Sequence, residues 1–225
     1  MNDIPALRSI FFYGTIDENW LGHQMAEIFR DLVYKPYLPL NKENTLALDI
    51  GGNIGLVSIY LSKYFDKIIA LEPSKLHLDA FTRNMVSNNI TNVTLINRAL
   101  YIKNGKFPFG GPPSNRTMRS MHMATWNGGK PDEEIEAITF DKLFEDEKIE
   151  HVDLLKLDIE GTEVEVLSSE GFQKVASKID IIVGESHHFT GRHPNQLNDA
   201  LKNNGFITTK TPISGASDLF VARRK

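Results

Sequence analysis

Short apolar segments alternate along this chain with longer amphipathic segments. The apolar segments have the length and composition of buried strands, and we place five of them at residues 45–50, 67–72, 92–97, 152–158 and 179–185. The amphipathic segments predict helices at residues 17–34, 56–65, 74–88, about 162–170 and about 195–204. Because strands that alternate with helices form parallel sheets, the pattern predicts a doubly wound α/β fold.

Two further apolar segments close the chain and predict an antiparallel hairpin. They span residues 206–210 and 218–223, and the turn-forming residues between them include Pro212, Ser214 and Gly215. We expect residues 1–40 to form an N-terminal helical extension and residues 41–225 to form the main domain.

Residues 103–134 do not fit the alternation of strands and helices. This insertion is rich in Gly and Pro, and it also carries Phe107, Phe109, Met118, Met121, Met123 and Trp126. Long loops in compact domains are often lids or binding loops. The apolar content argues against plain disorder. The insertion is therefore either a lid over a substrate or a structural β-insertion without a ligand role.

The clearest local signal is the run LALDIGGNIG at residues 46–55. An apolar strand ends near Asp49, a turn containing Gly51, Gly52 and Gly55 follows, and a helix then begins. Glycine lets a backbone turn tightly and approach a ligand. In doubly wound folds such a turn, at the carboxyl end of a parallel strand, binds a nucleotide-like cofactor.

The kind of cofactor depends on two further positions. Glu72 ends the second predicted strand about twenty residues after the turn, where an acid accepts hydrogen bonds from ribose hydroxyls. This acid suits NAD and S-adenosylmethionine equally. A dinucleotide fingerprint, G-x-G-x-x-G, would place a glycine where Asn53 stands, which argues against NAD. The alternative is that the glycines only make a tight turn and that Glu72 is solvated.

The run DLLKLDIEGTE at residues 153–163 departs from the apolar pattern of a central parallel strand. One face is apolar, with Leu155, Leu157 and Ile159. The other face carries Lys156, Asp158 and Glu160. Burying unpaired charges costs on the order of several kcal/mol. The charges therefore either form a structural ion pair with Lys156 or face a ligand at the open carboxyl end of the strand.

A third polar run, VGESHHF at residues 183–189, ends the fifth predicted strand. It brings Glu185, His187 and His188 to the edge of the sheet where Asp158 is expected. A carboxylate near imidazoles suits a general base or a divalent cation site. The alternative is that these histidines are structural or solvated.

Together these runs resemble the FkbM family of S-adenosylmethionine-dependent methyltransferases. The matching segments are LDIGGNIG at 48–55, ALEPS at 70–74, NRAL at 97–100 and LLKLDIEGTEVEVL at 154–167. The resemblance implies a class I methyltransferase (Rossmann-like) fold, with a mostly parallel seven-stranded sheet and a C-terminal antiparallel hairpin. It also implies O-methylation of a hydroxyl on a sugar, glycan or natural-product acceptor.

Roles for single residues follow from this resemblance and from the chemistry of methyl transfer. The expected ligands of the cofactor's methionine part are Asp49, Gly51, Asn53 and Gly55. Glu72 is assigned to the ribose, and Asn97 or Arg98 to the surroundings of the adenine. The expected acceptor side consists of Asp158, Glu160, Glu185 and His187. Some related sugar O-methyltransferases bind Mg²⁺ with acids after these two strands, which makes Asp158 and Glu185 the candidate metal ligands.

Composition limits the remaining alternatives. A net charge of −4 argues against duplex DNA as a partner, and the absence of cysteine excludes disulfides and thiolate chemistry. No apolar run reaches the roughly 18 residues of a membrane span, and the N-terminus lacks a signal-peptide pattern, so we expect a cytoplasmic protein. An NAD-dependent oxidoreductase and a non-catalytic cofactor-binding protein remain alternatives. An RNA ribose methyltransferase would need a local basic track, for which the candidates are Arg116, Arg119, Lys130 and Arg192.

Overall fold

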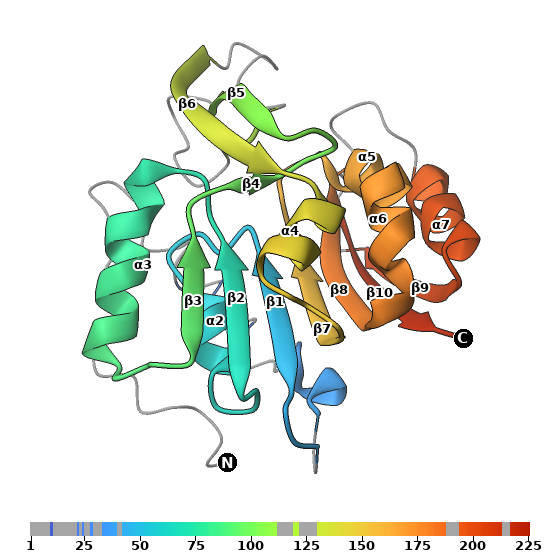
Figure 1. The fold of residues 1–225 in the computed structure, drawn as a ribbon, viewed down its shortest axis with the longest axis horizontal. Coiled ribbons are helices and arrows are strands. Elements are labelled where there is room, and N and C mark those ends of the chain that lie inside the picture. Colours follow the sequence, from blue (N-terminus) through green and yellow to red (C-terminus); the bar gives the residue numbers. More distant parts are fainter. Residues whose placement is uncertain are drawn as a thin grey trace.

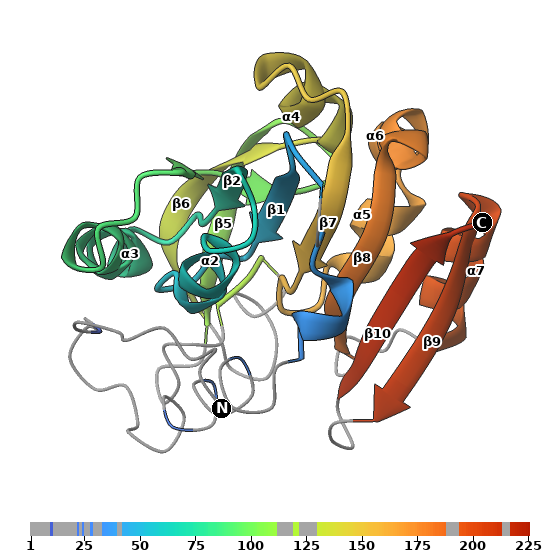
Figure 2. The same ribbon diagram turned by 90° about the horizontal axis from the view of Figure 1, so that it is seen from below.

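The structure is a computed structural model that describes residues 10, 22, 24, 28, 33–39, 42–111, 119–121, 130–187, 194–212 and 217–225. The predicted helix at residues 17–34 lies mostly outside this part of the chain, so the N-terminal extension stays a prediction. The described residues form a large sheet with helices on both faces and a second, smaller sheet (Figures 1 and 2).

The large sheet has seven strands in the order β3-β2-β1-β7-β8-β10-β9. Their bounds are β1 Leu46–Ile50, β2 Lys67–Leu71, β3 Val93–Ile96, β7 Val152–Leu157, β8 Ile179–His187, β9 Phe206–Pro212 and β10 Ser217–Arg224. The first five strands in this order pair in parallel, and β10 pairs antiparallel with both β8 and β9. The predicted fold class and the C-terminal hairpin are confirmed.

Helices cover the two faces of this sheet, and each face has its own apolar cluster (Figure 2). On one face lie α2 (Leu56–Leu61) and α3 (Lys75–Ser87). On the other lie α4 (Phe140–Asp146), α5 (Glu163–Ser168), α6 (Glu170–Val175) and α7 (Pro194–Asn203). The chain also forms two short 3-10 helices, η2 (Lys35–Tyr37) and η3 (Ala176–Lys178). Leu48 and Leu155 pack toward α4–α7, whereas Ala47 and Leu154 pack toward α2 and α3. By strand alternation, Asp49 and Lys156 also face α2.

Two helical predictions need correction. The single helix expected near residues 162–170 is two helices, because Ser169 has an extended backbone that ends α5 and its hydroxyl accepts a hydrogen bond from the Phe172 amide of α6. Helix α4 was not predicted from the sequence. It begins after Thr139, whose hydroxyl accepts from the Lys142 amide.

The described ends of the insertion pair with each other and, together with β4 before it, form the smaller sheet, with the order β4-β6-β5 (β4 Ala99–Leu100, β5 Gly105–Gly111, β6 Lys130–Ile138). Its apolar cluster includes Phe109 and Ile135. The sheet lies beyond the carboxyl ends of the central strands (Figure 1). Residues 112–118 and 122–129, which include Arg116, Met118, Met123 and Trp126, are outside the described residues. The β-structure at both ends agrees with the structural interpretation of the insertion, and its position leaves the lid interpretation open.

Candidate functional site

A pocket of about 370 Å³ lies at the carboxyl ends of the central strands, within the size range typical of small-molecule sites. Its described walls come from the β1–α2 turn, the ends of β2, β7 and β8, the insertion and the N-terminal segment. The residues with predicted roles that line it are Gly51, Asn53, Glu72, Arg98, Asp158, Glu160, Glu185 and His187. The carboxyl ends of the parallel strands thus bring together most of the predicted site.

The glycine-rich turn needs its glycines because two strands meet there. Gly51 has a φ of +82°, and a Cβ at this position would lie 1.8 Å from the backbone oxygen of Asp158. The amides of Gly51 and Gly52 both donate to the carbonyl of Leu71. The turn is therefore clamped between the ends of β2 and β7.

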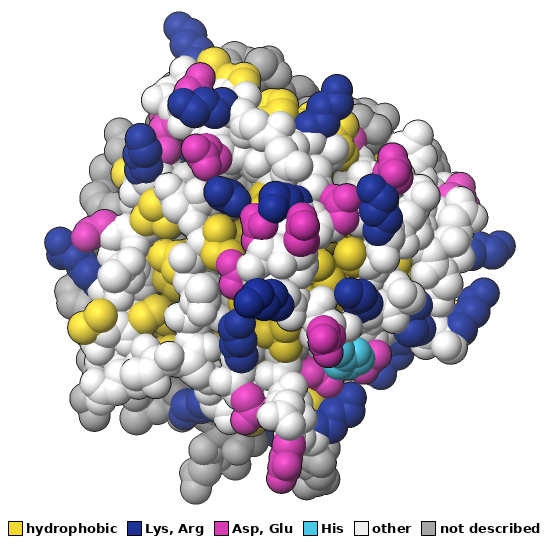
Figure 3. All heavy atoms as spheres, viewed as in Figure 1, with side chains coloured by type: hydrophobic (Ala, Val, Ile, Leu, Met, Phe, Trp, Pro, Cys, Tyr) yellow, Lys and Arg dark blue, Asp and Glu magenta, His cyan; other side chains and the backbone are white. Residues whose placement is uncertain are grey.

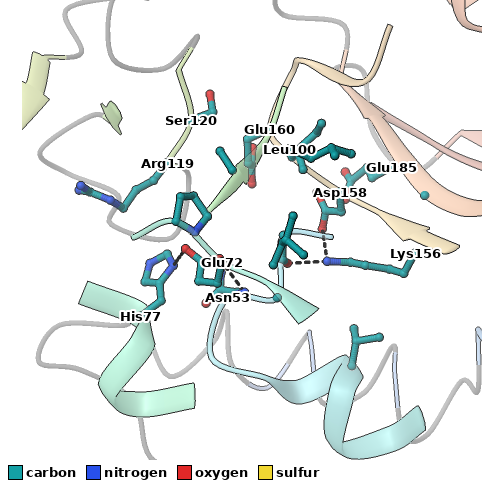
Figure 4. A pocket seen from close by; sticks show the side chains of 18 of the residues that line it. Asn53, Glu72, His77, Leu100, Arg119, Ser120, Lys156, Asp158, Glu160 and Glu185 are labelled. Carbon is teal, nitrogen blue, oxygen red and sulfur yellow. Dashed lines mark hydrogen bonds and ion pairs between the residues drawn. The ribbon is translucent and has the colours of Figure 1, made fainter. Parts of the chain in front are cut away.

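Glu72 is buried at the end of β2, and its carboxylate is held by three protein donors (Figure 4). The amides of Asn53 and Ser74 each donate at 2.8 Å, and Nδ1 of His77 lies 3.0 Å away. A carboxylate has about four acceptor positions. One position is therefore left for a hydroxyl in the pocket. Glu72 is not solvated, contrary to the alternative interpretation of this acid.

Asp49 lies below the pocket and does not line it. Its Oδ2 accepts from the hydroxyl of Ser58 at 2.6 Å, and its Oδ1 lies 3.3 Å from Nζ of Lys156. Asp49 is fully buried, so this network supports the turn from the α2 side.

Gly55 and Asn97 also act from outside the pocket wall. Gly55, with a φ of +87°, precedes helix α2 and packs against Phe81. The amide nitrogen of the Asn97 side chain donates to the carbonyls of Glu72 and Pro73 at 3.0 and 2.9 Å. Asn97 therefore holds the loop that carries Glu72 rather than reaching into the pocket.

The acceptor side begins where β7 ends. The strand stops at Leu157, one residue earlier than predicted, and Asp158 follows at the pocket wall. Glu160 is not on the strand: it has a φ of +54°, in a turn, so the predicted period of two does not extend to it. Its carboxylate still faces the pocket (Figure 4). A left-handed backbone at a residue other than glycine is costly and is often found at functional sites.

His187 is a buried cation among carboxylates. Its Nδ1 bonds to Glu163 at 2.9 Å, and its Nε2 lies 3.5 Å from Glu160 and 3.8 Å from Glu185. Burial disfavours the protonated ring, but the hydrogen bond to Glu163 and the charges of the nearby carboxylates outweigh it and raise the pKa of His187 to about 11. The imidazole is thus charged and points Nε2 at the acceptor side.

Two of the carboxyl groups around His187, those of Glu160 and Glu185, hold protons more strongly than usual. Burial and neighbouring negative charges raise the pKa of Glu160 to about 8, against the opposing charge of His187. Burial and the charge of Asp158 raise the pKa of Glu185. Shifted carboxyl groups in a pocket are typical of sites that transfer protons.

Several residues of the site were missed by sequence reasoning. Glu163 accepts from the amides of Ile159 and Gly161 at 3.2 and 3.0 Å in addition to binding His187. Its position within the matched EGTE segment was the available signal. The other missed pocket residues include His77, Leu100 and Ser120, whereas Phe109, Arg119 and Met121, which also line the pocket, lie in the insertion that the sequence analysis singled out.

The basic residues at the pocket are paired with acids. Arg119 is buried over the ring of Phe109 and binds Asp132 and Glu133. Arg98 pairs with acids of the insertion and of α4. On the face seen in Figure 3, acidic and basic side chains are interspersed. Two of the candidates for a basic track, Arg116 and Arg192, lie outside the described residues.

The strand order and the site together define the class I methyltransferase fold. A solved precorrin-6y C5,15-methyltransferase from Geobacter metallireducens superposes with a TM-score of 0.52 at 14% identity, covering 86% of each chain. An rRNA methylase from Streptococcus thermophilus gives a TM-score of 0.52 at 11% identity, covering 88% of this chain and 95% of that one. At these identities the likeness shows the fold alone.

Sequence comparison gives the family. The Methyltransferase FkbM domain model matches residues 26–208, and the chain therefore belongs to the FkbM methyltransferase family. It is 30% identical to methyltransferase sdnD of Sordaria araneosa, over 88% of both chains. It is 25% identical to the hexuronic acid methyltransferase AglP of Haloferax volcanii, over 82% of this chain and 72% of that one.

The protein is thus a methyltransferase, and S-adenosylmethionine is its methyl donor. The pocket fits this cofactor, because a buried acid with a spare acceptor position stands beside a glycine-rich turn. Among the described residues, no helix has the length and apolar character needed to cross a membrane.

Proposed function

We propose that this protein transfers a methyl group from S-adenosylmethionine to a hydroxyl of a sugar, glycan or natural-product acceptor. The observation that carries the proposal is the cluster of Asp158, Glu160, Glu185 and His187 beside the glycine-rich turn. A hydroxyl has a pKa far above 7 and needs a base, whereas a sulfonium methyl needs little activation. The name of the relative AglP agrees with a sugar-type acceptor.

The cofactor would be held by the residues at the ends of β1 and β2. Glu72 binds the ribose, Gly51 and Asn53 line the methionine part, and Arg98 lies toward the adenine. Asp49, Gly55 and Asn97 support these contacts from behind. When bound, the cofactor supplies an electrophilic methyl group on a sulfonium sulfur.

The acceptor's proton would be taken by a carboxylate of the acceptor side. Asp158 is the first candidate because it lines the pocket at the end of β7, directly against the cofactor turn. Glu160 is the second, and because its pKa is about 8 it would act as a base only in the ionised form that prevails above that pH. His187 stays charged and stabilises the carboxylates and the developing alkoxide.

A divalent cation is the alternative way to activate the hydroxyl. Asp158, Glu185 and His187 place one ligand atom each within 4.8 Å of one another. Asp158 and Glu185 offer the oxygen ligands that Mg²⁺ prefers, and a bound cation would lower the hydroxyl's pKa. Methyl transfer measured with EDTA and then with added Mg²⁺ separates the two mechanisms. Turnover that is lost with EDTA and recovered with Mg²⁺ would mean that the reaction requires the metal.

We propose that the insertion covers the acceptor. Phe109, Arg119, Ser120 and Met121 already reach the pocket from it. Exclusion of water would strengthen the electrostatics of the site. Limited proteolysis with and without S-adenosylhomocysteine checks this: protection of the insertion supports a lid, and equal cleavage in both states makes it structural.

The function is tested by incubating the protein with methyl-labelled S-adenosylmethionine and a panel of neutral sugars, uronic acids, hydroxylated natural products and an RNA oligonucleotide. We expect label in hydroxyl acceptors, as methyl ethers that resist mild alkali. Label released by mild alkali would mean a methyl ester and would overturn the hydroxyl acceptor. Label in the RNA alone would establish the ribose methyltransferase instead.

A further inference from the structure

Lys156 is a buried lysine at the junction of the cofactor turn and the acceptor side. Its side chain is 5% exposed. The ammonium donates to the carbonyl of Gly51 at 2.6 Å and to that of Ile50 at 3.3 Å. These two carbonyls belong to the peptide units that enter the glycine-rich turn.

The same ammonium is shared by two carboxylates from different strands. Its Nζ lies 3.3 Å from Asp49 Oδ1 on β1 and 3.9 Å from Asp158 Oδ2 after β7. Burial opposes the charge, but Asp49 and Asp158 outweigh burial and raise the pKa of Lys156. Lys156 is therefore a permanent positive charge between the two halves of the site.

The turn is fixed from two sides. From β2, the carbonyl of Leu71 accepts from the amides of Gly51 and Gly52. From β7, Lys156 holds the carbonyls, and the Asp158 amide donates to Ile50 O at 3.2 Å. The side chain of Lys156 thus contacts both this turn and Asp158, and it links the orientation of the turn to the position of Asp158 (Figure 4).

We propose that Lys156 is a positioning residue, which orients the Ile50–Gly51 backbone for the cofactor and couples that backbone to the acceptor-side carboxylate Asp158. The proposal rests on the proposed roles of the turn and of Asp158. The simpler alternative is a structural ion pair that stabilises the fold without affecting the cofactor.

The chain contains a matched control on the same strand. At the amino end of β7, Lys42 pairs with Asp153 at 3.1 Å, with 54% of its side chain exposed and no part in the pocket lining. Lys42→Met removes a lysine from a β7 ion pair far from the turn. A loss of cofactor affinity in folded Lys156→Met that Lys42→Met lacks is therefore not a general effect of removing a lysine from a β7 ion pair.

The measurement is the Kd of S-adenosylhomocysteine by calorimetry, together with the Tm of the cofactor-free protein. Lys156→Met should weaken binding by about tenfold or more, as expected for a lost charge-assisted hydrogen bond network. Because this variant leaves Asp49 without its cation and could unfold, the decisive pair is Asp49→Asn against Asp49→Asn with Lys156→Met. These two proteins differ only at position 156, where one carries a cation and the other a neutral side chain of similar length.

Weaker binding in the double variant than in Asp49→Asn supports the proposal, and equal binding overturns it. The coupling is tested by adding Asp158→Asn: its effect on Kd should shrink when Lys156 is Met, and an unchanged effect contradicts the coupling. Wild-type protein that binds no S-adenosylhomocysteine would instead overturn the assignment of the cofactor site.

Discussion

Strand β7 has a cluster of one histidine and two carboxylates near each end, and the two clusters share composition and spacing but differ in their surroundings. His151, Asp153 and Asp180 gather at the amino end, and Asp158, Glu185 and His187 gather at the carboxyl end. In each, the potential ligand atoms lie within 4.8 Å of one another.

Their surroundings separate the two clusters. At the amino end the His151 side chain is 51% exposed, and Lys42 already pairs with both Asp153 and Asp180. At the carboxyl end His187 is 7% exposed and faces a pocket. Close spacing of ligand-type residues therefore says little about function by itself, whereas burial beside a cavity and a shifted pKa distinguish a reaction site.

Of the differences that we expect between variants of the two clusters, the largest is in methyl transfer. Asp158→Asn should lower turnover by about two orders of magnitude or more, because a lost base costs that much, while Tm changes little. Asp153→Asn should do the reverse: its carboxylate accepts from the Leu46 amide, so stability falls by about 1–3 kcal/mol and turnover per folded molecule persists. Turnover is measured with labelled S-adenosylmethionine and an acceptor identified in the panel, and Tm is measured by calorimetry. Full turnover in Asp158→Asn would remove its catalytic role.

The next effect is on cofactor affinity. Glu72→Ala should weaken binding of S-adenosylhomocysteine by about 1.5–3 kcal/mol, the value of hydrogen bonds to a charged group. Asp180→Ala, which removes an acid of the amino-end cluster, should leave the Kd unchanged. Calorimetry checks both variants, and an unaltered Kd in Glu72→Ala would exclude Glu72 from the ribose site.

A smaller effect is on the pH dependence of stability. The pKa of Glu160 is about 8 in the fold against an ordinary value of 4.5, so its contribution is present at low pH and is lost as pH rises through 8. The pKa of His187, about 11 against 6.5, has the same sign, with stability lost as pH rises from 6.5 toward 11. The Tm of the cofactor-free protein should therefore fall between pH 5 and pH 9.

The variant Glu160→Gln should make this fall in Tm shallower, because it removes the group whose pKa is raised to about 8. A Tm that rises across the same pH range would contradict the raised pKa of Glu160. Differential scanning calorimetry at several pH values, with one buffer ionic strength, gives the slopes.

The smallest effect is that of Lys42→Met on folding. Its ammonium is half exposed, and exposed ion pairs contribute about 0–1 kcal/mol. We expect a change in the free energy of unfolding within that range, and a smaller one at high salt. A larger loss in urea denaturation would contradict the small contribution expected of this exposed ion pair.

The sequence predicted the central strands and the residues at their ends because both are local signals. Apolar runs mark β1, β2, β7 and β8, and the polar residues after them must meet at one edge of a parallel sheet. The cofactor turn was recognisable because glycines at fixed spacing relieve a clash, such as that of Gly51 with the Asp158 backbone.

The features of the fold and of the site that were not predicted depend mostly on contacts between residues far apart in the sequence. Glu133 bonds to the Ser74 hydroxyl across 59 positions, and no local pattern indicates it. Ser74 directly precedes helix α3, but its hydroxyl donates to Glu133 and makes no capping hydrogen bond to the helix. The left-handed turn at Glu160 was missed because strand periodicity was extended past the end of β7.

Glu133 has a consequence for engineering the acceptor range. This single carboxylate accepts from Ser74 Oγ and the Lys75 amide at 3.0 Å and binds Arg119 at 2.7 Å, so it fastens the smaller sheet to the loop that carries Glu72. A graft that replaces residues 103–134 with the corresponding segment of a relative exchanges one side of the pocket as a cassette. Such a chimera keeps the contacts that attach the smaller sheet to the Glu72 loop only if an acid is retained at position 133. Recombination libraries should therefore vary the segment and hold that residue constant.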